Sequence, residues 1–412
     1  MQNSGFFKPL LPCNICKCSQ CHNINAGKQK KARYKHRKDI KMETPSKVYF
    51  TDMRTDYAHT LLEKLDALIV RAGIDKIDFN GKFTAIKIHF GEPGNLAFLR
   101  PNFAKVVAQR IKALGGKPFL TDCSTLYVGQ RKNALDHLDA ANENGFNPTT
   151  CGCQIIIADG LNGADERLVS VENGEYVKEA KIGTAIMEAD IVISLNHFKG
   201  HEGSGFGGAL KNLGMGCGSR AGKMEQHNEG KPVVDKELCV GCRRCTTQCA
   251  HGAITVTERK ATIDHSKCVG CGRCISACRP EAISVPGGSA NDNFCRKMAE
   301  YAKAVVQHRP SFHINIVMDV SPFCDCHREN DAAIIPDVGM LASFDPVALD
   351  RACADLCNRM PIIPNTQLSE NRDKGIEGDH FHVNHPSTDW RVTLEHAEKI
   401  GIGTQQYELI EI

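Results

Sequence analysis

Residues 191–212 read Ile191-Val-Ile-Ser-Leu-Asn-His-Phe-Lys-Gly-His-Glu-Gly-Ser-Gly-Phe-Gly-Gly-Ala-Leu-Lys-Asn212. The apolar run at 191–195 predicts a short buried strand, and the glycine-rich loop behind it leads into the start of a helix. In open α/β sheets, ligands bind beyond the carboxyl ends of the strands. We therefore expect a binding site in the residues that follow this strand.

The same alternation of strands and helices extends on both sides of this stretch. Short apolar runs predict further strands at 48–51, 83–90, 119–122, 155–158 and 312–320. Apolar residues at helical spacing predict helices at 57–72, 101–114, 133–141, 292–306 and 346–356, and a last helix around Trp390. This order is typical of an α/β fold with a mainly parallel sheet and helices on both faces.

Residues 233–286 break this alternation and repeat themselves. Asp235-Lys-Glu-Leu-Cys-Val-Gly-Cys-Arg-Arg-Cys245 matches Asp264-His-Ser-Lys-Cys-Val-Gly-Cys-Gly-Arg-Cys274, and each copy is too short to bury a core alone. We therefore expect a small inserted α+β domain at 232–288, flanked by the two parts of the α/β domain at 46–231 and 289–412.

The overall composition excludes several classes of protein. The 412 residues are 42% apolar and 24% charged, which indicates a globular chain large enough for two or three domains. The sequence has no run of roughly 20 apolar residues that would predict a membrane helix. A net charge of only +3 gives no reason to expect nucleic-acid binding. The 21 cysteines suggest metal ligands in a reducing compartment, the cytoplasm, rather than disulfides.

Residues 1–41 form a basic leader that differs from the rest of the chain. They hold ten basic residues and one acidic residue, whereas the remainder carries 41 basic and 47 acidic side chains. We expect the leader to be disordered, and either dispensable or not native to the protein. Four cysteines in it have a spacing that suits a zinc ion as an alternative: Cys13, Cys16, Cys18 and Cys21.

The strongest motif is a doubled run of cysteines in the repeated segment. The spacing Cys-x2-Cys-x2-Cys-x3-Cys occurs at 239–249 and again at 268–278, as in bacterial ferredoxins with two [4Fe-4S] clusters. In such runs the fourth cysteine binds the other cluster. We expect one cluster on Cys239, Cys242, Cys245 and Cys278, and the second on Cys268, Cys271, Cys274 and Cys249. Two zinc sites are the alternative.

The loop after the strand at 191–195 predicts an anion site. Lys199 and Lys211 supply positive charge, and His201 is a candidate general acid or metal ligand. Glycines let backbone N–H groups approach a carboxylate or phosphate, and the candidates are Gly203, Gly205, Gly207 and Gly208. A nicotinamide dinucleotide site is a weaker interpretation, because no second strand ends in an acidic residue at the required distance. A simple tight turn with surface histidines is the remaining alternative.

Two other predicted strand ends contribute candidates. Lys87 and His89 lie on one side of the strand at 83–90, where burial without partners would be costly. The strand at 312–320 leads to Cys324, Cys326 and His327, which offer a further metal site or a redox thiol pair. A passive loop is the alternative there.

Several of these runs also resemble a known family. They are Lys87-Ile-His-Phe-Gly-Glu-Pro-Gly-Asn95, His197-Phe-Lys-Gly-His201, Gly207-Gly-Ala-Leu-Lys-Asn-Leu-Gly214 and Phe344-Asp-Pro-Val-Ala348. Over about residues 46–365 the chain is similar to ferredoxin-fused members of the domain-of-unknown-function 362 family. This resemblance implies an iron–sulfur protein with an α/β domain, of a kind found largely in anaerobes, without an assigned reaction. It points to Lys199, His201, Lys211 and Asn212, and more weakly to Asp345.

Our leading hypothesis is an oxidoreductase that receives electrons from a redox partner protein. Its two [4Fe-4S] clusters would pass electrons to an anionic substrate or cofactor at a site lined by His89, Lys199, His201, Lys211 and Asn212. One alternative is an electron-relay module without chemistry of its own, which would lack a deep pocket at the strand ends. The other is a metal or cofactor assembly protein.

Overall fold

The computed structural model describes residues 44–126, 129–228, 231–249, 251–268, 272–280, 282–284 and 292–412. The expectations for the leader at 1–41, including its four cysteines, lie outside these residues. The same is true of Cys271, one of the eight predicted cluster ligands.

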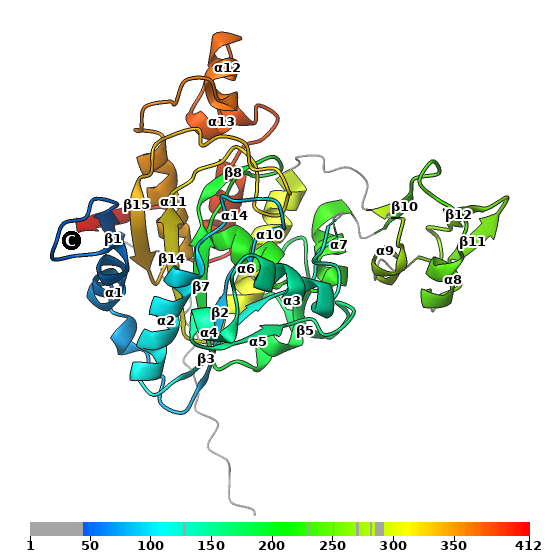
Figure 1. Ribbon diagram of the computed structural model, residues 1–412, viewed down its shortest axis with the longest axis horizontal. Helices are drawn as coiled ribbons and strands as arrows, with labels where there is room; N and C mark the ends of the chain where they lie inside the picture. Colours follow the sequence, from blue (N-terminus) through cyan, green and yellow to red (C-terminus); the bar gives the residue numbers. More distant parts are fainter. Residues whose placement is uncertain are drawn as a thin grey trace, which may run out of the picture. The chain divides into compact units, whose positions relative to one another are not determined.

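An eight-stranded sheet forms the centre of the fold (Figure 1). Its strand order is β16 (Tyr407–Glu411), β1 (Ser46–Asp52), β15 (Gly339–Ser343), β14 (Ser311–Val317), β7 (Ile191–His197), β2 (Phe83–Lys87), β3 (Lys117–Asp122) and β4 (Gln154–Ile157). Neighbouring strands run parallel except at β15, which is antiparallel to both β1 and β14. The prediction of an α/β fold with a mainly parallel sheet is therefore confirmed.

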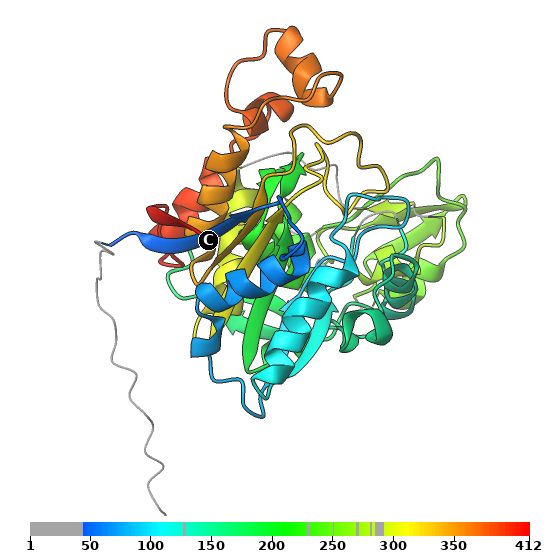
Figure 2. The same ribbon diagram turned by 60° about the vertical axis from the view of Figure 1, so that its left-hand side comes forward.

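Helices cover both faces of this sheet (Figure 2). On β7, Ile191 and Ile193 belong to one buried cluster, which contains α1 (Leu61–Arg71) and α2 (Pro101–Ala113). Val192, between them, belongs to the other cluster. That cluster contains residues of α6 (Ala209–Cys217), α10 (Asp292–Val306), α11 (Pro346–Cys357) and α14 (Arg391–Lys399). Because a strand buried on both faces needs apolar side chains at successive positions, the continuous apolar run at 191–193 fits its central place.

The remaining elements are short. The helices are η1 (Ile74–Lys76), α3 (Ala134–Glu143), α4 (Pro148–Cys151), α5 (Thr184–Glu188), α7 (Arg220–Asn228), α12 (Gln367–Asp373) and α13 (His380–Asn384). Two hairpins stand apart from the main sheet: β5 (Glu166–Ser170) with β6 (Glu179–Gly183), and β8 (Lys199–His201) with β9 (Gly205–Gly207). The second hairpin replaces the simple glycine loop expected after β7.

Element boundaries differ from the predictions where local chemistry intervenes. The helix predicted at 57–72 begins at Leu61, because Thr60 and Glu63 form a reciprocal capping box. The backbone N–H of Thr60 donates to the Glu63 carboxylate at 2.8 Å. The strand predicted at 83–90 ends at Lys87, and the three residues beyond it enter the loop that carries His89.

The repeated segment folds into two small two-stranded sheets and two short helices. Strand β10 (Val233–Val234) pairs with β13 (Ile283–Ser284), and β11 (Ile254–Thr257) pairs with β12 (Lys260–Ile263). Helices α8 (Arg244–Gln248) and α9 (Arg273–Ala277) contact each other. Strands that precede and follow this segment, β7 and β14, are neighbours in the main sheet. None of the helices in the described ranges combines the length and apolar character that a membrane crossing requires.

Replacement of Gly214 tests the close packing of α6 on α10. A Cβ atom at Gly214 would collide with the backbone carbonyl oxygen of Met298, which has no rotamer with which to move away. We expect Gly214→Ala to lower the free energy of unfolding by about 1–3 kcal/mol, as overpacking does. Urea unfolding followed by circular dichroism measures this loss. In the control Gly203→Ala, the nearest atom is a side-chain carbon 3.2 Å away, and near wild-type stability is expected. Equal stability of both variants would contradict the packing argument.

Candidate functional site

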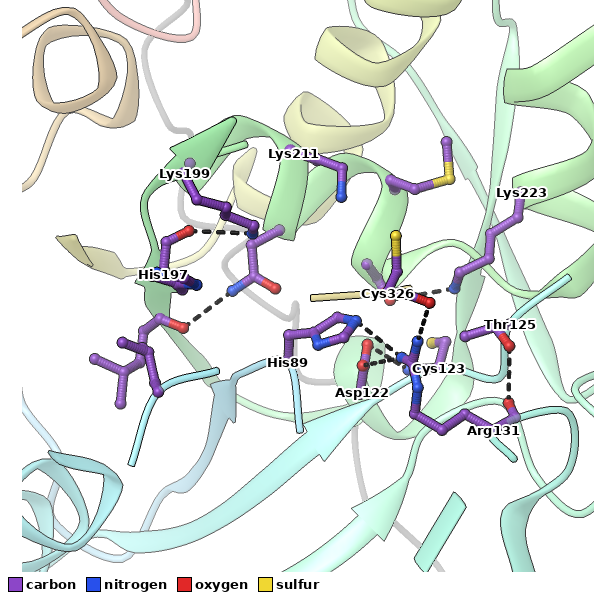
Figure 3. Close-up of a pocket in the computed structure, with 16 residues that line it drawn as sticks. His89, Asp122, Cys123, Thr125, Arg131, His197, Lys199, Lys211, Lys223 and Cys326 are labelled. Atoms are coloured by element: carbon purple, nitrogen blue, oxygen red, sulfur yellow. Dashed lines mark hydrogen bonds and ion pairs between the residues drawn. The ribbon is translucent and has the colours of Figure 1, made fainter. Parts of the chain in front are cut away.

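A cavity lies at the carboxyl ends of β2, β3 and β7, where the sheet topology predicts a ligand site (Figure 3). The centre of a water molecule can occupy a volume of about 50 Å³ inside this cavity. That volume has room for a few waters or one small molecule. Four cationic side chains and one carboxylate line it: Arg131, Lys199, Lys211, Lys223 and Asp122. The excess of positive charge favours an anionic ligand.

A buried ion pair supports one wall of this cavity. Lys87 is fully buried, and its Nζ lies 2.9 Å from Asp122 Oδ1. The same ammonium donates a hydrogen bond of 2.6 Å to Asn212 Oδ1. Burial opposes ionisation of Asp122, but Lys87 and the other nearby cations outweigh it, so the pKa of this carboxyl is lowered. Lys87 therefore orients Asn212, one of the predicted site residues, toward the cavity that Asn212 lines.

His89 also lines the cavity, as a neutral ring. Burial lowers its pKa well below the usual value, and the charges of Arg131 and Lys199 lower it further. Its Nε2 lies 2.8 Å from Arg131 Nη1 and serves as the acceptor for that guanidinium. Arg131 in turn pairs with Glu92 at 2.7 Å. His89 thus holds Arg131 in place at the cavity wall.

His197, the last residue of β7, has a polar partner at each of its two ring nitrogens. Nδ1 lies 2.8 Å from Asp325 Oδ1, and Nε2 lies 2.8 Å from the carbonyl oxygen of Met318. Burial opposes ionisation of Asp325, but His197 and Lys199 lower its pKa to about 2. Asp325 thereby links β7 to the loop that follows β14.

His201 lies behind the cavity rather than in its lining among the described residues. It is buried, and its Nδ1 accepts hydrogen bonds from the backbone N–H groups of Gly203 at 3.0 Å and Ser204 at 3.1 Å. Burial lowers its pKa well below the usual value. The ring is therefore neutral with its proton on Nε2, which lies 3.7 Å from Glu202 Oε1.

The structure differs in one respect from the predicted anion site at the glycines. Gly208 precedes α6 and lines the cavity, but the first N–H groups of α6 already have an acceptor. Asp350 accepts from Ala209 N at 2.7 Å and from Leu210 N at 2.9 Å. Burial raises the pKa of Asp350 to about 6 against these hydrogen bonds. The Asp350 carboxylate thus takes the place at the helix start that an anionic ligand would need. Anion binding by the backbone of Gly203, Gly205 and Gly207 stays a prediction.

The loop after β14 brings its two cysteines to the same region. Lys211 Nζ lies 3.0 Å from Cys324 Sγ, and Cys326 lines the cavity. A hydrogen bond from the Cys324 thiol and the charge of Lys211 lower the pKa of Cys326, although burial opposes this. His327 Nε2 lies 2.8 Å from Glu202 Oε1, and that carboxylate raises the pKa of the imidazole.

Sequence reasoning missed several cavity residues. Arg131 and Lys223 have no motif around them, and only folding brings them beside the ends of β2, β3 and β7. Glu202 and Asp325 lie outside the lining, where they pair with His327 and His197. Each stands next to a predicted residue in the sequence, so adjacency to His201 and Cys326 was the available signal. The predicted residues His89, Lys199, Lys211, Asn212 and Cys326 do come together in the lining.

The cysteines of the repeated segment line two further hollows. The first is lined by Cys239, Cys242, Cys245 and Cys278, and the second by Cys249, Cys268 and Cys274. Each hollow therefore combines cysteines of both copies, in the division expected from the spacing. Helix α7 connects this segment to the cavity, because Met224 packs in one buried cluster with Cys245 and Cys274, whereas the preceding Lys223 lines the cavity.

Comparison with known proteins places the chain in a family. Residues 84–355 match the family described as a domain of unknown function, DUF362, and the chain belongs to that family. None of the curated proteins matches the chain.

The comparison with solved structures finds weak similarity to two proteins. The lactate racemase apoprotein from Thermoanaerobacterium thermosaccharolyticum is 14% identical, with a TM-score of 0.35, over 62% of this chain and 49% of that one. A protein from Thermotoga maritima is 13% identical, with a TM-score of 0.37, over 72% of this chain and 57% of that one. The chain spans about half the length of these proteins, and likenesses of this size say nothing about its activity.

Replacement of Lys87 tests the buried pair that supports the cavity wall. We expect Lys87→Met to lower the free energy of unfolding by about 3–5 kcal/mol, because Asp122 keeps a buried charge without its nearest partner. In the double variant Lys87→Met/Asp122→Asn, the loss should be smaller than the sum of the two single losses. Urea unfolding at pH 7 provides all three values.

A matched control lies just before the start of the same strand. Lys82 and Asp78 form a pair of similar length, 2.8 Å, but their side chains are 36% and 72% exposed. Lys82→Met should therefore change stability by less than about 1 kcal/mol. A similar loss in Lys87→Met and Lys82→Met would show that burial of the first pair is not decisive.

Proposed function

We propose that this protein binds two [4Fe-4S] clusters and transfers electrons to a small anionic molecule held in its own cavity. The observation that carries the proposal is the grouping of cysteines from both copies of the repeat around two separate hollows. A [4Fe-4S] cluster takes four thiolates, and ferredoxin runs exchange their fourth cysteine in this way. Zinc sites would need no such exchange between copies.

Backbone groups near the cysteines also suit thiolate ligands. Ala261 N donates to Cys239 Sγ at 3.3 Å, and Ala253 N donates to Cys249 Sγ at 3.3 Å. These N–H groups lie at the first hollow and the second hollow, respectively. Hydrogen bonds to cluster sulfurs stabilise the reduced, more negative state and so tune its potential. When bound, the clusters would supply one-electron transfers at low potential.

The two hollows differ in their relation to the cavity. A residue of the second hollow, Gly272, lies against the side chain of Arg220 in α7, the helix that also carries Lys223. In the first hollow, Cys242 is exposed, and it is flanked by the exposed side chains of Leu238 and Val240. This arrangement supports contact with a redox partner protein at the first hollow, and delivery to the cavity from the second.

The chain's own residues then bind and orient the electron acceptor. Lys223 donates to the carbonyl oxygen of Gly218 at 2.6 Å, and no carboxylate contacts its ammonium within the described residues. It is therefore the cation best placed to pair with a carboxylate or phosphate of the ligand. Figure 3 shows Lys199, Lys211 and Lys223 entering the cavity from one side and His89 and Arg131 from the other. Asn212 adds a neutral amide to orient the ligand.

Iron analysis tests the cluster part of the proposal. Anaerobically isolated protein should contain about eight iron atoms per chain and give the EPR signal of reduced [4Fe-4S] clusters after dithionite. Cys249→Ser should lower the iron content and alter that signal, because Cys249 belongs to the second set. Cys357→Ser is the control, since Cys357 is a buried residue of α11 in the sheet core. Protein without iron, or zinc in place of iron, would refute this part.

Anion binding tests the cavity part. We expect oxalate to bind in calorimetric titrations and oxamide, its uncharged analogue, not to bind, because the cavity carries excess positive charge. Lys223→Met should weaken oxalate binding by about tenfold, the value of one charge-assisted hydrogen bond. The control Lys181→Met removes an ammonium that pairs with Glu225 at 2.9 Å, away from the cavity lining. Equal affinity of both variants for oxalate would contradict the assignment.

A further inference from the structure

We propose that Glu202, Cys326 and His327 bind a divalent transition-metal ion of the zinc or ferrous type at the edge of the cavity. The ligands come from two loops, one within the β8–β9 hairpin and one after β14. The metal site stands independently of the iron–sulfur proposal, and only its use by a substrate rests on the proposed function.

The first argument is geometric. One ligand atom from each of the three residues lies within 4.8 Å of the other two. Ligand atoms around a tetrahedral zinc ion are about 3.3–3.6 Å apart, given its usual bond lengths to nitrogen, oxygen and sulfur. His327 Nε2 and Glu202 Oε1 are 2.8 Å apart, so small side-chain movements would place an ion between the three atoms.

The second argument concerns the carboxylate. Glu202 Oε2 is itself shielded from solvent and has no hydrogen-bond partner among the described residues, while the side chain as a whole is 40% exposed. An unsatisfied carboxylate oxygen is costly away from water, and such groups in native structures call for an explanation such as an ion. A metal ion would satisfy this oxygen, while His201 Nε2, 3.7 Å from Oε1, is positioned to orient the carboxylate from behind.

The third argument selects the cysteine. The sequence offered Cys324 and Cys326 equally, but the structure gives them different neighbours. Cys324 Sγ contacts the ammonium of Lys211 at 3.0 Å, whereas Cys326 belongs to the group with Glu202 and His327. A thiolate and a carboxylate together balance the charge of a divalent ion, and a neutral imidazole completes a mixed donor set that suits zinc or ferrous iron.

The two loops are held together by backbone contacts, so the ligands are organised before an ion binds. Gly200 N donates to the carbonyl oxygen of Ser321 at 2.9 Å, and a Cβ at Gly200 would collide with the carbonyl oxygen of Pro322. His385 Nε2 also donates to Pro322 O, at 2.7 Å. Glycine at position 200 is thus required for the close approach of the hairpin to the cysteine loop.

Three protein ligands leave at least one coordination position open, as in catalytic rather than structural zinc sites. Cys326 lines the cavity, so the open position faces the space where the anion would bind. At this position the ion would coordinate an oxygen of the anionic ligand and polarise the bond to that oxygen. The cations of the cavity would bind the remaining negative charge.

Zinc K-edge absorption spectroscopy tests the site without interference from iron. The full-length protein is isolated anaerobically with its iron and mixed with one equivalent of Zn²⁺, and unbound zinc is then removed. We expect about one zinc per chain with one sulfur at about 2.3 Å and nitrogen or oxygen ligands at about 2.0–2.2 Å. Zinc at any of the four-cysteine motifs would instead show four sulfur ligands.

Variants test two of the three ligands. His327→Ala and Cys326→Ser should each weaken zinc binding by at least about tenfold, since even residues that only support metal ligands cost that much. Cys324→Ser is the matched control and should keep the one-sulfur spectrum. The iron content should stay unchanged in all three variants.

Two results would overturn the proposal: a spectrum with four sulfur ligands only, or zinc affinity unaffected by His327→Ala. If the isolated protein contains no iron, the cluster proposal fails separately. The difference between the wild-type and His327→Ala zinc spectra then still reports on this site alone.

Discussion

The burial of the central strands on both faces is the constraint from which the site follows. Strands β7 and β14 contribute apolar side chains to the clusters on both faces of the sheet, and β2 places Ile86 in one of these clusters and Ala85 in a third, smaller cluster. Unpaired charge along the middle of these strands would be costly. Polar chemistry is therefore concentrated at the carboxyl edge, where Lys87, Asp122 and His197 are the last residues of their strands.

Charge at this edge is balanced in pairs before any ligand arrives. Lys87 pairs with Asp122, Arg131 with Glu92, and His197 with Asp325. Each pair joins two segments, so the same contacts that neutralise buried charge also hold the loops of the cavity in place. Lys223 contacts backbone carbonyl oxygens instead, which leaves its charge for the cavity. Arg131, Lys199 and Lys223 are therefore buried cations held in place, unlike flexible lysines at a protein surface.

Much of the fold followed from periodicity, because long amphipathic segments allow few alternatives. The helix predicted at 292–306 is α10 with the same boundaries, and the parallel order of β2, β3 and β4 fits the expected alternation. The short hairpin β8–β9 was not predicted, since its alternation is hidden among glycines. Likewise β16, at the sheet edge, is half exposed and lacks a clear apolar pattern.

The residues alone determined the class of fold, the cysteine runs and most of the cationic candidates, because these depend on local spacing and on residue chemistry. Tertiary contacts decided which candidates share a site. They placed His201 behind the cavity, put the Asp350 carboxylate at the start of α6, and gave Cys324 and Cys326 different partners. They also brought Glu202 to His327 across 125 residues of chain. Such contacts depend on how the loops at several strand ends converge, which no local pattern records.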